Sequence, residues 1–289
     1  MQDGAKYEAI EISDSDKASI RFLYNTIFGR ILLKLLILPF ISKLAGFLLR
    51  SPASRFFIEG FIEQNSIDME EFRDVKYKSF DDFFTREIKY GYRPLPESET
   101  DIIAPCDGKL SAYPVTTDSL FKIKRSIYSI HDLLQDAKLA DEFNGGTCLI
   151  FRLSPDDYHR YIYIDDGEIL HQKRIKGVLH TVQPIAYQRC DVFCRNTREY
   201  TVIQTKNFDK VIQMEVGALF VGRISNHGKN HTVKRGEEKG MFRFGGSTII
   251  LLFKKDSVDI EDAIFENTLQ NKETIIKMGI KVGAALTRY

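Results

Sequence analysis

The sequence predicts an α+β fold, in which a mostly antiparallel β body follows N-terminal amphipathic helices and precedes a C-terminal helix. Between residues 102 and 253, short segments rich in β-branched and aromatic residues alternate with Gly, Asp and Asn, which is typical of antiparallel strands. Before residue 50 the chain is apolar and helix-like. Because no internal repeat or low-complexity linker interrupts the rest, we expect one compact domain over residues 51–289, preceded by helices within residues 1–50.

The composition is that of a folded globular protein and excludes two classes of function. Lys and Arg (41) almost balance Asp and Glu (40) over 289 residues, so no basic field indicates a nucleic-acid partner. The four cysteines form no CxxC pair, which favours a reduced intracellular compartment. The spacing of Cys190 and Cys194, with His180 upstream, does not match the usual zinc modules, so no metal site is expected.

Residues 22–49 are both very apolar and cationic. Arg30, Lys34 and Lys43 lie within the stretch, Arg50 follows it, and no acidic residue occurs. A membrane-spanning helix needs about 20 mostly apolar residues without charges, and Pro39 breaks the run. Two amphipathic helices lying in a membrane interface, with their cations toward anionic headgroups, fit this pattern. A hairpin of core helices fits it equally well, and residues 1–20 are a loose polar lead.

The remaining elements follow from local patterns. Short helices are expected between residues 56 and 90, with Ser79 before Asp81 and Asp82 as a helix N-cap. A last helix is expected over residues 260–276. The expected strands cover residues 102–113, 147–153, 159–164, 199–205, 210–224 and 247–253.

The most informative segment is Phe244-Gly245-Gly246-Ser247-Thr248, which is followed by five apolar residues. Glycines allow unusual backbone conformations, and Ser247 follows a peptide carbonyl that its own hydroxyl can reach. The pattern indicates internal chemistry in which Ser247 attacks the carbonyl of Gly246 and the chain is broken there. The alternative is an ordinary turn before a buried strand.

Two further segments offer the groups that such a serine needs. A serine hydroxyl is a weak nucleophile until a base takes its proton, and the base needs an orienting partner. Asp107 lies in the turn Ala104-Pro105-Cys106-Asp107-Gly108, and His159 begins a strand after Ser154-Pro155-Asp156-Asp157-Tyr158. Each of these residues alone is more often structural, and His227 and His231 are interpreted as solvated loop residues.

Taken together, the motifs resemble those of phosphatidylserine decarboxylase proenzymes from about residue 22 to residue 283. The matching segments, in order, are SFDDFFTREIKYGYRP (Ser79–Pro94), APCDG (Ala104–Gly108), LSPDDYHRY (Leu153–Tyr161), FCRNTREYTVIQT (Phe193–Thr205), VGALFVGRI (Val216–Ile224) and FGGSTIILLF (Phe244–Phe253). The resemblance implies a self-cleavage triad of Asp107, His159 and Ser247, with the cut between Gly246 and Ser247. Many members carry a second histidine three residues after the first. This chain has Ile162 there, so either His159 performs both tasks or His180 is an auxiliary residue.

The resemblance also implies the reaction. Self-cleavage would convert Ser247 into a covalent pyruvoyl cofactor and leave the short chain 247–289 bound to the rest. This group would form a Schiff base with phosphatidylserine in a membrane and release carbon dioxide and phosphatidylethanolamine. We expect peripheral attachment to the cytoplasmic face of a bacterial membrane; a homo-oligomer is left open. Alternatives are a pyruvoyl decarboxylase of a soluble amino acid and a lipid-binding paralogue that does not cleave.

Overall fold

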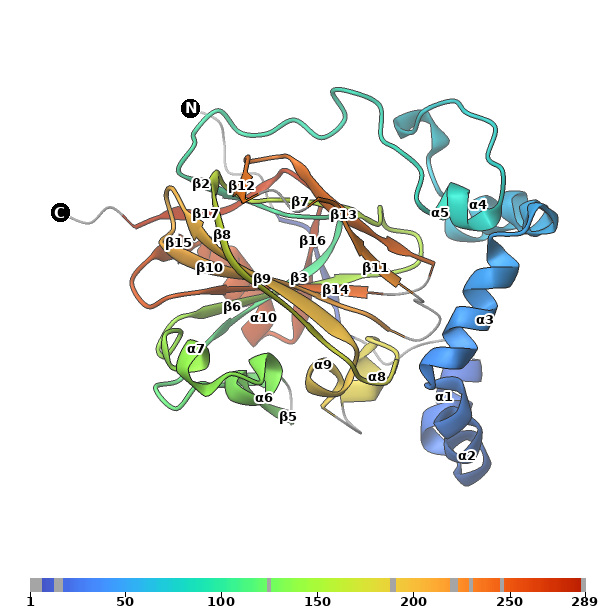
Figure 1. The fold of residues 1–289 in the computed structure, drawn as a ribbon, viewed down its shortest axis with the longest axis horizontal. Helices are drawn as coiled ribbons and strands as arrows, with labels where there is room; N and C mark the ends of the chain where they lie inside the picture. Colours follow the sequence, from blue (N-terminus) through green and yellow to red (C-terminus); the bar gives the residue numbers. More distant parts are fainter. Residues whose placement is uncertain are drawn as a thin grey trace.

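A computed structural model of the chain describes residues 7–12, 18–123, 126–187, 191–218, 223–228, 231–244 and 247–286 (Figure 1). Within these residues the β body is built on a nine-stranded sheet in the order β1-β16-β3-β6-β14-β10-β9-β8-β12. The strands of this sheet are β1 (Ala9–Glu11), β3 (Gly108–Pro114), β6 (Thr147–Leu153), β8 (Gly167–Ile175), β9 (Arg198–Thr205), β10 (Lys210–Val216), β12 (Thr232–Val233), β14 (Ser247–Phe253) and β16 (Lys272–Ile276).

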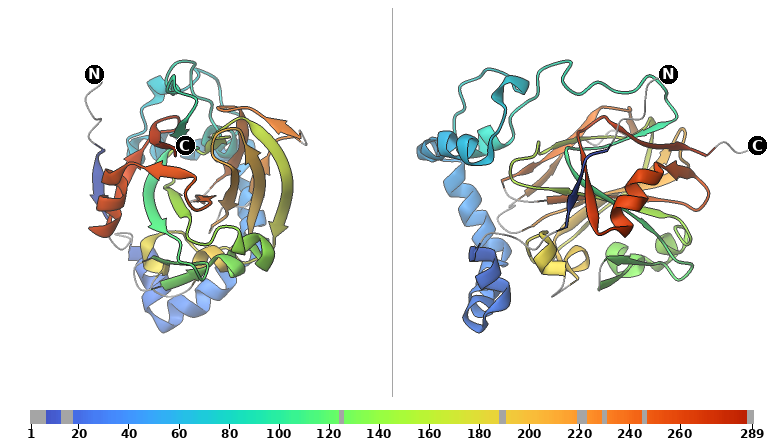
Figure 2. Two further views of the ribbon diagram at one scale, coloured as in Figure 1. Left: turned by 90° about the vertical axis from the view of Figure 1, so that its left-hand side faces the viewer. Right: turned by 180° about the vertical axis from the view of Figure 1, so that it is seen from behind.

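Three smaller sheets complete the body. One is formed by β11 (Arg223–Asn226), β13 (Glu238–Arg243) and β7 (Arg160–Ile162); another by β15 (Val258–Ile260), β17 (Lys281–Ala285) and β2 (Asp101–Ile103); and the last by β4 (Leu120–Ile123) and β5 (Ser126–Ser129). The paired strands run antiparallel. Figure 2 shows them curving around the core, with β1 at one flank and β8 at the other. The predicted α+β class is confirmed.

The strand β14 lies in the middle of the large sheet, between β6 and β10. All seven of its residues are buried, which explains why the sequence shows an apolar run rather than an alternating pattern. β6 and β14 have the predicted bounds. The predicted strand over residues 102–113 is divided into β2 and β3 by the turn that contains Asp107, and the one over residues 210–224 includes β10 and only the start of β11.

The C-terminal helix is shorter than predicted. It is α10 (Asp262–Leu269), and residues 272–276 form β16 instead. Asn271 has a left-handed backbone with φ of 60°, a conformation that ends a helix and that Asn tolerates better than most residues. The residues after it include Thr274, Ile275 and Ile276, whose branched side chains favour a strand.

Helices occur in the predicted N-terminal regions and also between the strands, where none was predicted. The N-terminal ones are α1 (Ala18–Asn25), α2 (Ile27–Leu36), α3 (Pro39–Leu49), η1 (Pro52–Phe57), α4 (Ile58–Asn65), η2 (Met69–Glu71) and α5 (Phe80–Phe84). Between the strands lie α6 (Ile130–Leu134), α7 (Ala137–Asp141), α8 (Pro184–Tyr187) and α9 (Val192–Arg195). As predicted, Pro39 separates two helices and Ser79 caps α5, accepting a hydrogen bond from the Asp82 amide.

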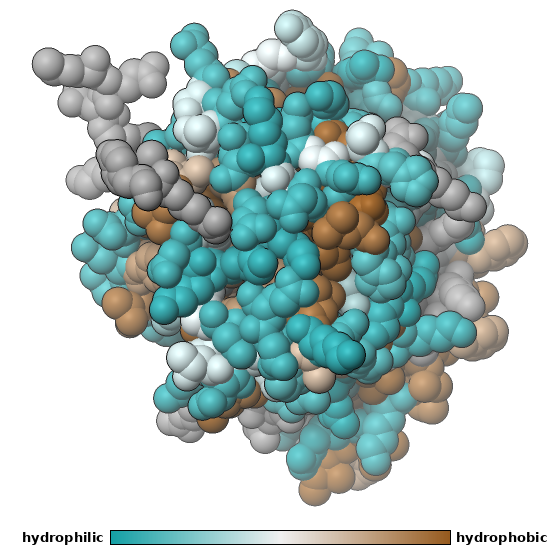
Figure 3. Space-filling view, turned by 60° about the vertical axis from the view of Figure 1, so that its left-hand side comes forward, coloured by the Kyte–Doolittle hydropathy of each residue, from teal (hydrophilic) through white to brown (hydrophobic). Residues whose placement is uncertain are grey.

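The helices α1, α2 and α3 form an arm along one side of the body (Figure 1). One face of the arm joins the main core through Leu23, Tyr24 and Leu33. The opposite face exposes large apolar side chains, among them Phe28 at 80% and Phe40 at 71%. None of the helices in the described ranges combines the length and the apolar character needed to cross a bilayer. By contrast, the face of the body in Figure 3 is largely hydrophilic.

Candidate active site

The candidate site lies at one end of the large sheet. Because β3 and β14 both run antiparallel to β6, their first residues lie beside the last residues of β6. Ser247 pairs with Leu153, and Lys109 pairs with Arg152. The predicted residues Asp107 and Ser247 therefore flank the end of β6, and the segment that leaves this strand leads to His159. Three segments distant in sequence thus meet at the same end of the large sheet.

Ser247 is the first residue of β14 and is fully buried. Its hydroxyl oxygen makes no hydrogen bond to a described residue, although buried polar atoms normally have a partner. The preceding residues Gly245 and Gly246, and with them the predicted cleavage bond, lie outside the described residues. The buried hydroxyl is thus not engaged by the described part of the protein.

His159 is also fully buried. Its Nδ1 atom lies 2.8 Å from the backbone carbonyl oxygen of Asp157, and its ring centroid lies 4.1 Å from that of Phe84. Because a carbonyl oxygen only accepts hydrogen bonds, Nδ1 is assigned as the protonated nitrogen and Nε2 carries the lone pair in the neutral ring. The arrangement therefore makes Nε2 the atom that can take a proton.

The loop that orients His159 is held by a lysine that the sequence interpretation missed. The Asp157 carboxylate accepts hydrogen bonds from the Ser154 amide at 2.6 Å and from Lys109 Nζ at 2.8 Å. Burial raises the pKa of the Asp157 carboxyl, and Lys109 opposes that effect. Because Lys109 follows directly after the Asp107 turn, it joins two of the predicted motifs. Its position directly after that motif was its sequence signal.

Asp107 does not contact His159 through a hydrogen bond, so the predicted triad is not connected in that way. Its two oxygens accept hydrogen bonds from Arg93 at 3.0 and 2.8 Å, from Lys277 at 3.3 Å and from the Met278 amide at 2.8 Å. Burial alone would raise the pKa of the Asp107 carboxyl, but Arg93 and Lys277 outweigh it, and the pKa lies below its ordinary value. Asp107 is therefore held as a carboxylate.

His180 contacts helix α1 of the N-terminal arm. Its Nδ1 atom is 3.2 Å from the Tyr24 hydroxyl, which also accepts a hydrogen bond from the Thr181 amide. Burial, aided by the charge of Arg195, lowers the pKa of His180 to about 4. His180 thus links the N-terminal arm to the body. Ile162, where many members have histidine, is buried in the main core.

The two loop histidines differ. His227 is half-exposed and contacts Glu238 at 2.5 Å, while His231 is exposed. Cys190, which belonged to the dismissed zinc pattern, lies outside the described residues. Within those residues, no group of three His, Cys, Asp or Glu side chains is placed to hold a metal ion.

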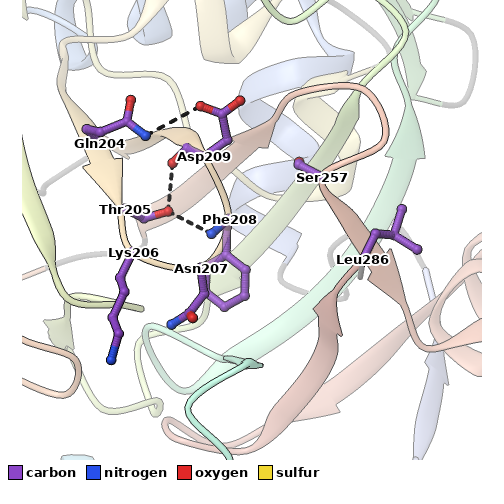
Figure 4. Close-up of a pocket in the computed structure, with 8 residues that line it drawn as sticks. All are labelled: Gln204, Thr205, Lys206, Asn207, Phe208, Asp209, Ser257 and Leu286. Carbon is purple, nitrogen blue, oxygen red and sulfur yellow. Dashed lines mark hydrogen bonds between the residues drawn. The ribbon is translucent and has the colours of Figure 1, made fainter. Parts of the chain in front are cut away.

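A pocket of about 420 Å³ lies at the opposite end of the sheet. Figure 4 shows its lining around the turn between β9 and β10, with Gln204 and Asp209 hydrogen-bonded to each other. β14 ends beside this region, since Val211 pairs with Phe253. The pocket has no histidine in its lining and is separated from Ser247 by the full length of β14, so it is not the site that the motifs predict.

Comparison with known proteins decides the family. The sequence profile described as phosphatidylserine decarboxylase matches residues 80–284, which is most of the chain. The chain belongs to the phosphatidylserine decarboxylase family. The resemblance predicted from the motifs is thereby confirmed, and the protein is an enzyme of this decarboxylase family.

Individual relatives agree along nearly their whole length. The chain is 49% identical to phosphatidylserine decarboxylase proenzyme 2 of Clostridium acetobutylicum, with 91% of each chain covered. It is 43% identical to a phosphatidylserine decarboxylase proenzyme of Ruminiclostridium cellulolyticum, over 92% of this chain and 91% of the relative. A third relative, the proenzyme of Clostridium perfringens, is 41% identical over 91% of this chain and 92% of its own.

Proposed function

We propose that the chain is a self-cleaving, pyruvoyl-dependent decarboxylase that converts phosphatidylserine to phosphatidylethanolamine and carbon dioxide. The observation that supports this best is the buried Ser247 hydroxyl, which has no hydrogen-bond partner among the described residues and begins the strand that follows the glycine pair. The relatives are named proenzymes, a word for a precursor that matures.

The maturation step would consume only the chain itself and one water molecule. The Ser247 hydroxyl attacks the Gly246 carbonyl carbon, the C–N bond breaks, and an ester replaces the amide. A base then removes the α-proton of residue 247, a Cα–Cβ double bond forms, and the Cβ–O bond breaks to release the Gly246 carboxylate. Water hydrolyses the resulting enamine, by way of its imine, to a pyruvoyl group and ammonia.

His159 is the base proposed for these proton transfers. Its Nδ1 is committed to the Asp157 carbonyl, so the neutral ring would take the serine proton at Nε2. The same ring would return a proton to the substrate carbon after carbon dioxide leaves. Asp107, held by Arg93 and Lys277, would act by the charge and position of its turn rather than by orienting the imidazole.

The surroundings of Ser247 fit the pyruvoyl group. A small, buried residue at the start of a central strand can become a small ketone without displacing a neighbour. Once formed, the group supplies an electrophilic carbonyl for the substrate amine and an acceptor for the electron pair that decarboxylation releases.

The N-terminal arm is proposed to hold the enzyme on an anionic membrane. Its exposed residues include apolar side chains, such as Phe28 and Phe40, and the cations Arg30 and Lys34. Apolar insertion with about 1 kcal/mol per cation near the surface would give peripheral attachment. This placement suits a phospholipid better than a soluble amino acid, which needs no membrane.

The test is the mass of the purified protein. Wild type should give two chains, with the short one beginning at a blocked residue 247. Ser247→Ala should give one uncut chain, while Ser257→Ala, which removes a hydroxyl at the far end of the sheet, should still be cut. If Ser247→Ala is cut at the same bond, attack by this serine is wrong. Decarboxylation of dispersed phosphatidylserine, compared with free serine, tests the substrate.

A further inference from the structure

The short helix α5 contacts both the proposed base and the residues just before the glycine pair. It forms because Ser79 caps its first turn, and the Phe80 amide donates a hydrogen bond of 2.8 Å to Ser54 Oγ in η1. Four of its five residues are buried; Asp82 is the exception. The helix is therefore fixed to the molecule at its own start.

Asp81 connects α5 to the end of β13. Its carboxylate accepts a hydrogen bond of 2.6 Å from Arg243 Nη1, and the Asp81 side chain is only 5% exposed. An ion pair with one buried partner is screened less by solvent than a surface pair. The next residue, Asp82, makes no ion pair with any described residue; it accepts a hydrogen bond from the Lys78 amide at 2.8 Å.

Aromatic contacts continue from the same helix. The Phe244 ring packs edge-on against Phe80 and Phe84, with both centroid distances 5.2 Å. Phe84 also contacts the His159 ring at 4.1 Å. One side chain of α5 thus lies between the imidazole and the residue that directly precedes Gly245.

The α5 contacts fix the backbone just before the glycine pair, which has no side chains of its own to pack. Gly245 and Gly246 have no side chains that packing could hold, so the position of the Gly246 carbonyl must be set by its neighbours in the chain. Downstream, β14 is fixed by pairing on both sides. Upstream, the last described residues are Arg243 and Phe244, and both are held by α5.

We propose that α5 fixes Arg243 and Phe244, the residues just before the glycine pair, relative to His159, with Asp81 and Arg243 as positioning residues for self-cleavage. This inference rests on the proposed self-cleavage and assigns the attack step to the α5 contacts. A displacement of about 1 Å in a reacting group can cost roughly a hundredfold in rate. Loss of the Asp81–Arg243 pair should therefore slow cleavage without abolishing it.

The experiment follows cleavage of freshly translated full-length protein by mass over time. Asp81→Asn and Arg243→Gln should each slow cleavage roughly ten- to hundredfold. Arg243→Lys should recover part of the rate because the charge is kept. Asp82→Asn, on the same helix, is the matched control and should cleave like wild type. Thermal unfolding midpoints of the Ser247→Ala forms should differ little between Asp81→Asn and Asp82→Asn.

Hydroxylamine separates the attack from the later elimination, because it cleaves esters and would trap the Gly246 ester as a hydroxamate. In Asp81→Asn it should not restore the rate, since little ester forms. Rapid hydroxamate formation in Asp81→Asn, or cleavage of Asp81→Asn and Arg243→Gln at the wild-type rate, would overturn the positioning role. If wild type itself is never cut, the proposed function fails instead, which is a separate result.

Discussion

The ion pair of Glu215 and Lys239 joins the large sheet to the sheet of β11, β13 and β7. Both side chains are fully buried, and Lys239 Nζ lies 2.6 Å from each Glu215 oxygen. Asn226 donates a third hydrogen bond to Glu215 at 3.1 Å. We predict that Lys239→Met destabilises the protein, because methionine fills the space of the lysine stem but leaves the carboxylate without its counter-charge.

The size of the effect is limited by protonation. Burial raises the pKa of the Glu215 carboxyl, and the charge and hydrogen bonds of Lys239 oppose this. Without Lys239 the group would take up a proton rather than remain a buried anion. Taking about 4.3 as the pKa in the unfolded chain, neutralising it at pH 7 costs about 4 kcal/mol, and at pH 5 only about 1 kcal/mol. In Lys239→Met the pKa of Glu215 is higher in the folded than in the unfolded chain, so the loss of stability shrinks as pH falls toward about 4.3.

The assay is urea unfolding of cleavage-blocked Ser247→Ala protein at several pH values, with and without Lys239→Met. The matched control is Lys234→Met, which removes an exposed pair with Asp166 and should change stability little. Glu215→Gln added to Lys239→Met should recover much of the loss at pH 7. A destabilisation by Lys239→Met that is the same at pH 5 and pH 7 would refute the argument from an unpaired buried charge.

Three further outcomes are expected. If His159 is the base for maturation, the mass of His159→Ala should be that of the uncut chain, while His180→Ala should be cut. Cutting of His159→Ala but not of His180→Ala would assign that role to His180. Because the pKa of His180 falls to about 4 on folding, the unfolded chain binds the extra proton between about pH 6.5 and 4. Thermal stability should therefore decline as pH falls through this window, and less so in His180→Phe. Phe28→Ser with Phe40→Ser should weaken binding to anionic vesicles at every salt concentration, as sedimentation shows, whereas Leu269→Ser, on a residue 87% exposed in α10, should not; equal binding by all three proteins would place the membrane contact elsewhere.

The salt dependence of that binding separates its two sources. Attraction of the arm's cations weakens as salt is raised, while apolar insertion does not, so partial release is expected. Removing residues 1–50 is a less clean test, because Leu23, Tyr24 and Leu33 belong to the main core. A truncated protein could lose its fold for that reason alone.

The strands were predictable where the sequence pattern is local. β6 and β14 each contain an apolar run with polar or glycine boundaries, so their ends could be predicted from the sequence. The C-terminal helix was overextended because nothing in the pattern of residues 260–276 showed that Asn271 would adopt a left-handed backbone. α5 was predictable through its serine cap, a signal contained within four residues.

The site was only partly predictable. Asp107, His159 and Ser247 stand in short motifs, and the family relationship directed attention to them. Their electrostatic partners could not be assigned in the same way: Arg93 lies within the Ser79–Pro94 segment and Lys109 directly after the Ala104–Gly108 segment, but either could as well be a solvated surface cation. Arg93 meets Asp107 across 14 residues, and Lys109 meets Asp157 across 48. Such pairings depend on how strands approach one another in the folded protein, which no single motif encodes.

The central position of β14 has a consequence if the chain is cut between residues 246 and 247, as proposed. The strand is hydrogen-bonded on one side to β6 and on the other to β10, and β16 and β17 of the same C-terminal part pair with β3 and β2. Separating the two products would require β14 to break its hydrogen bonds to both neighbouring strands in the middle of the sheet. The two fragments would therefore stay together without the peptide bond between residues 246 and 247. They should copurify as one particle and separate only in denaturant.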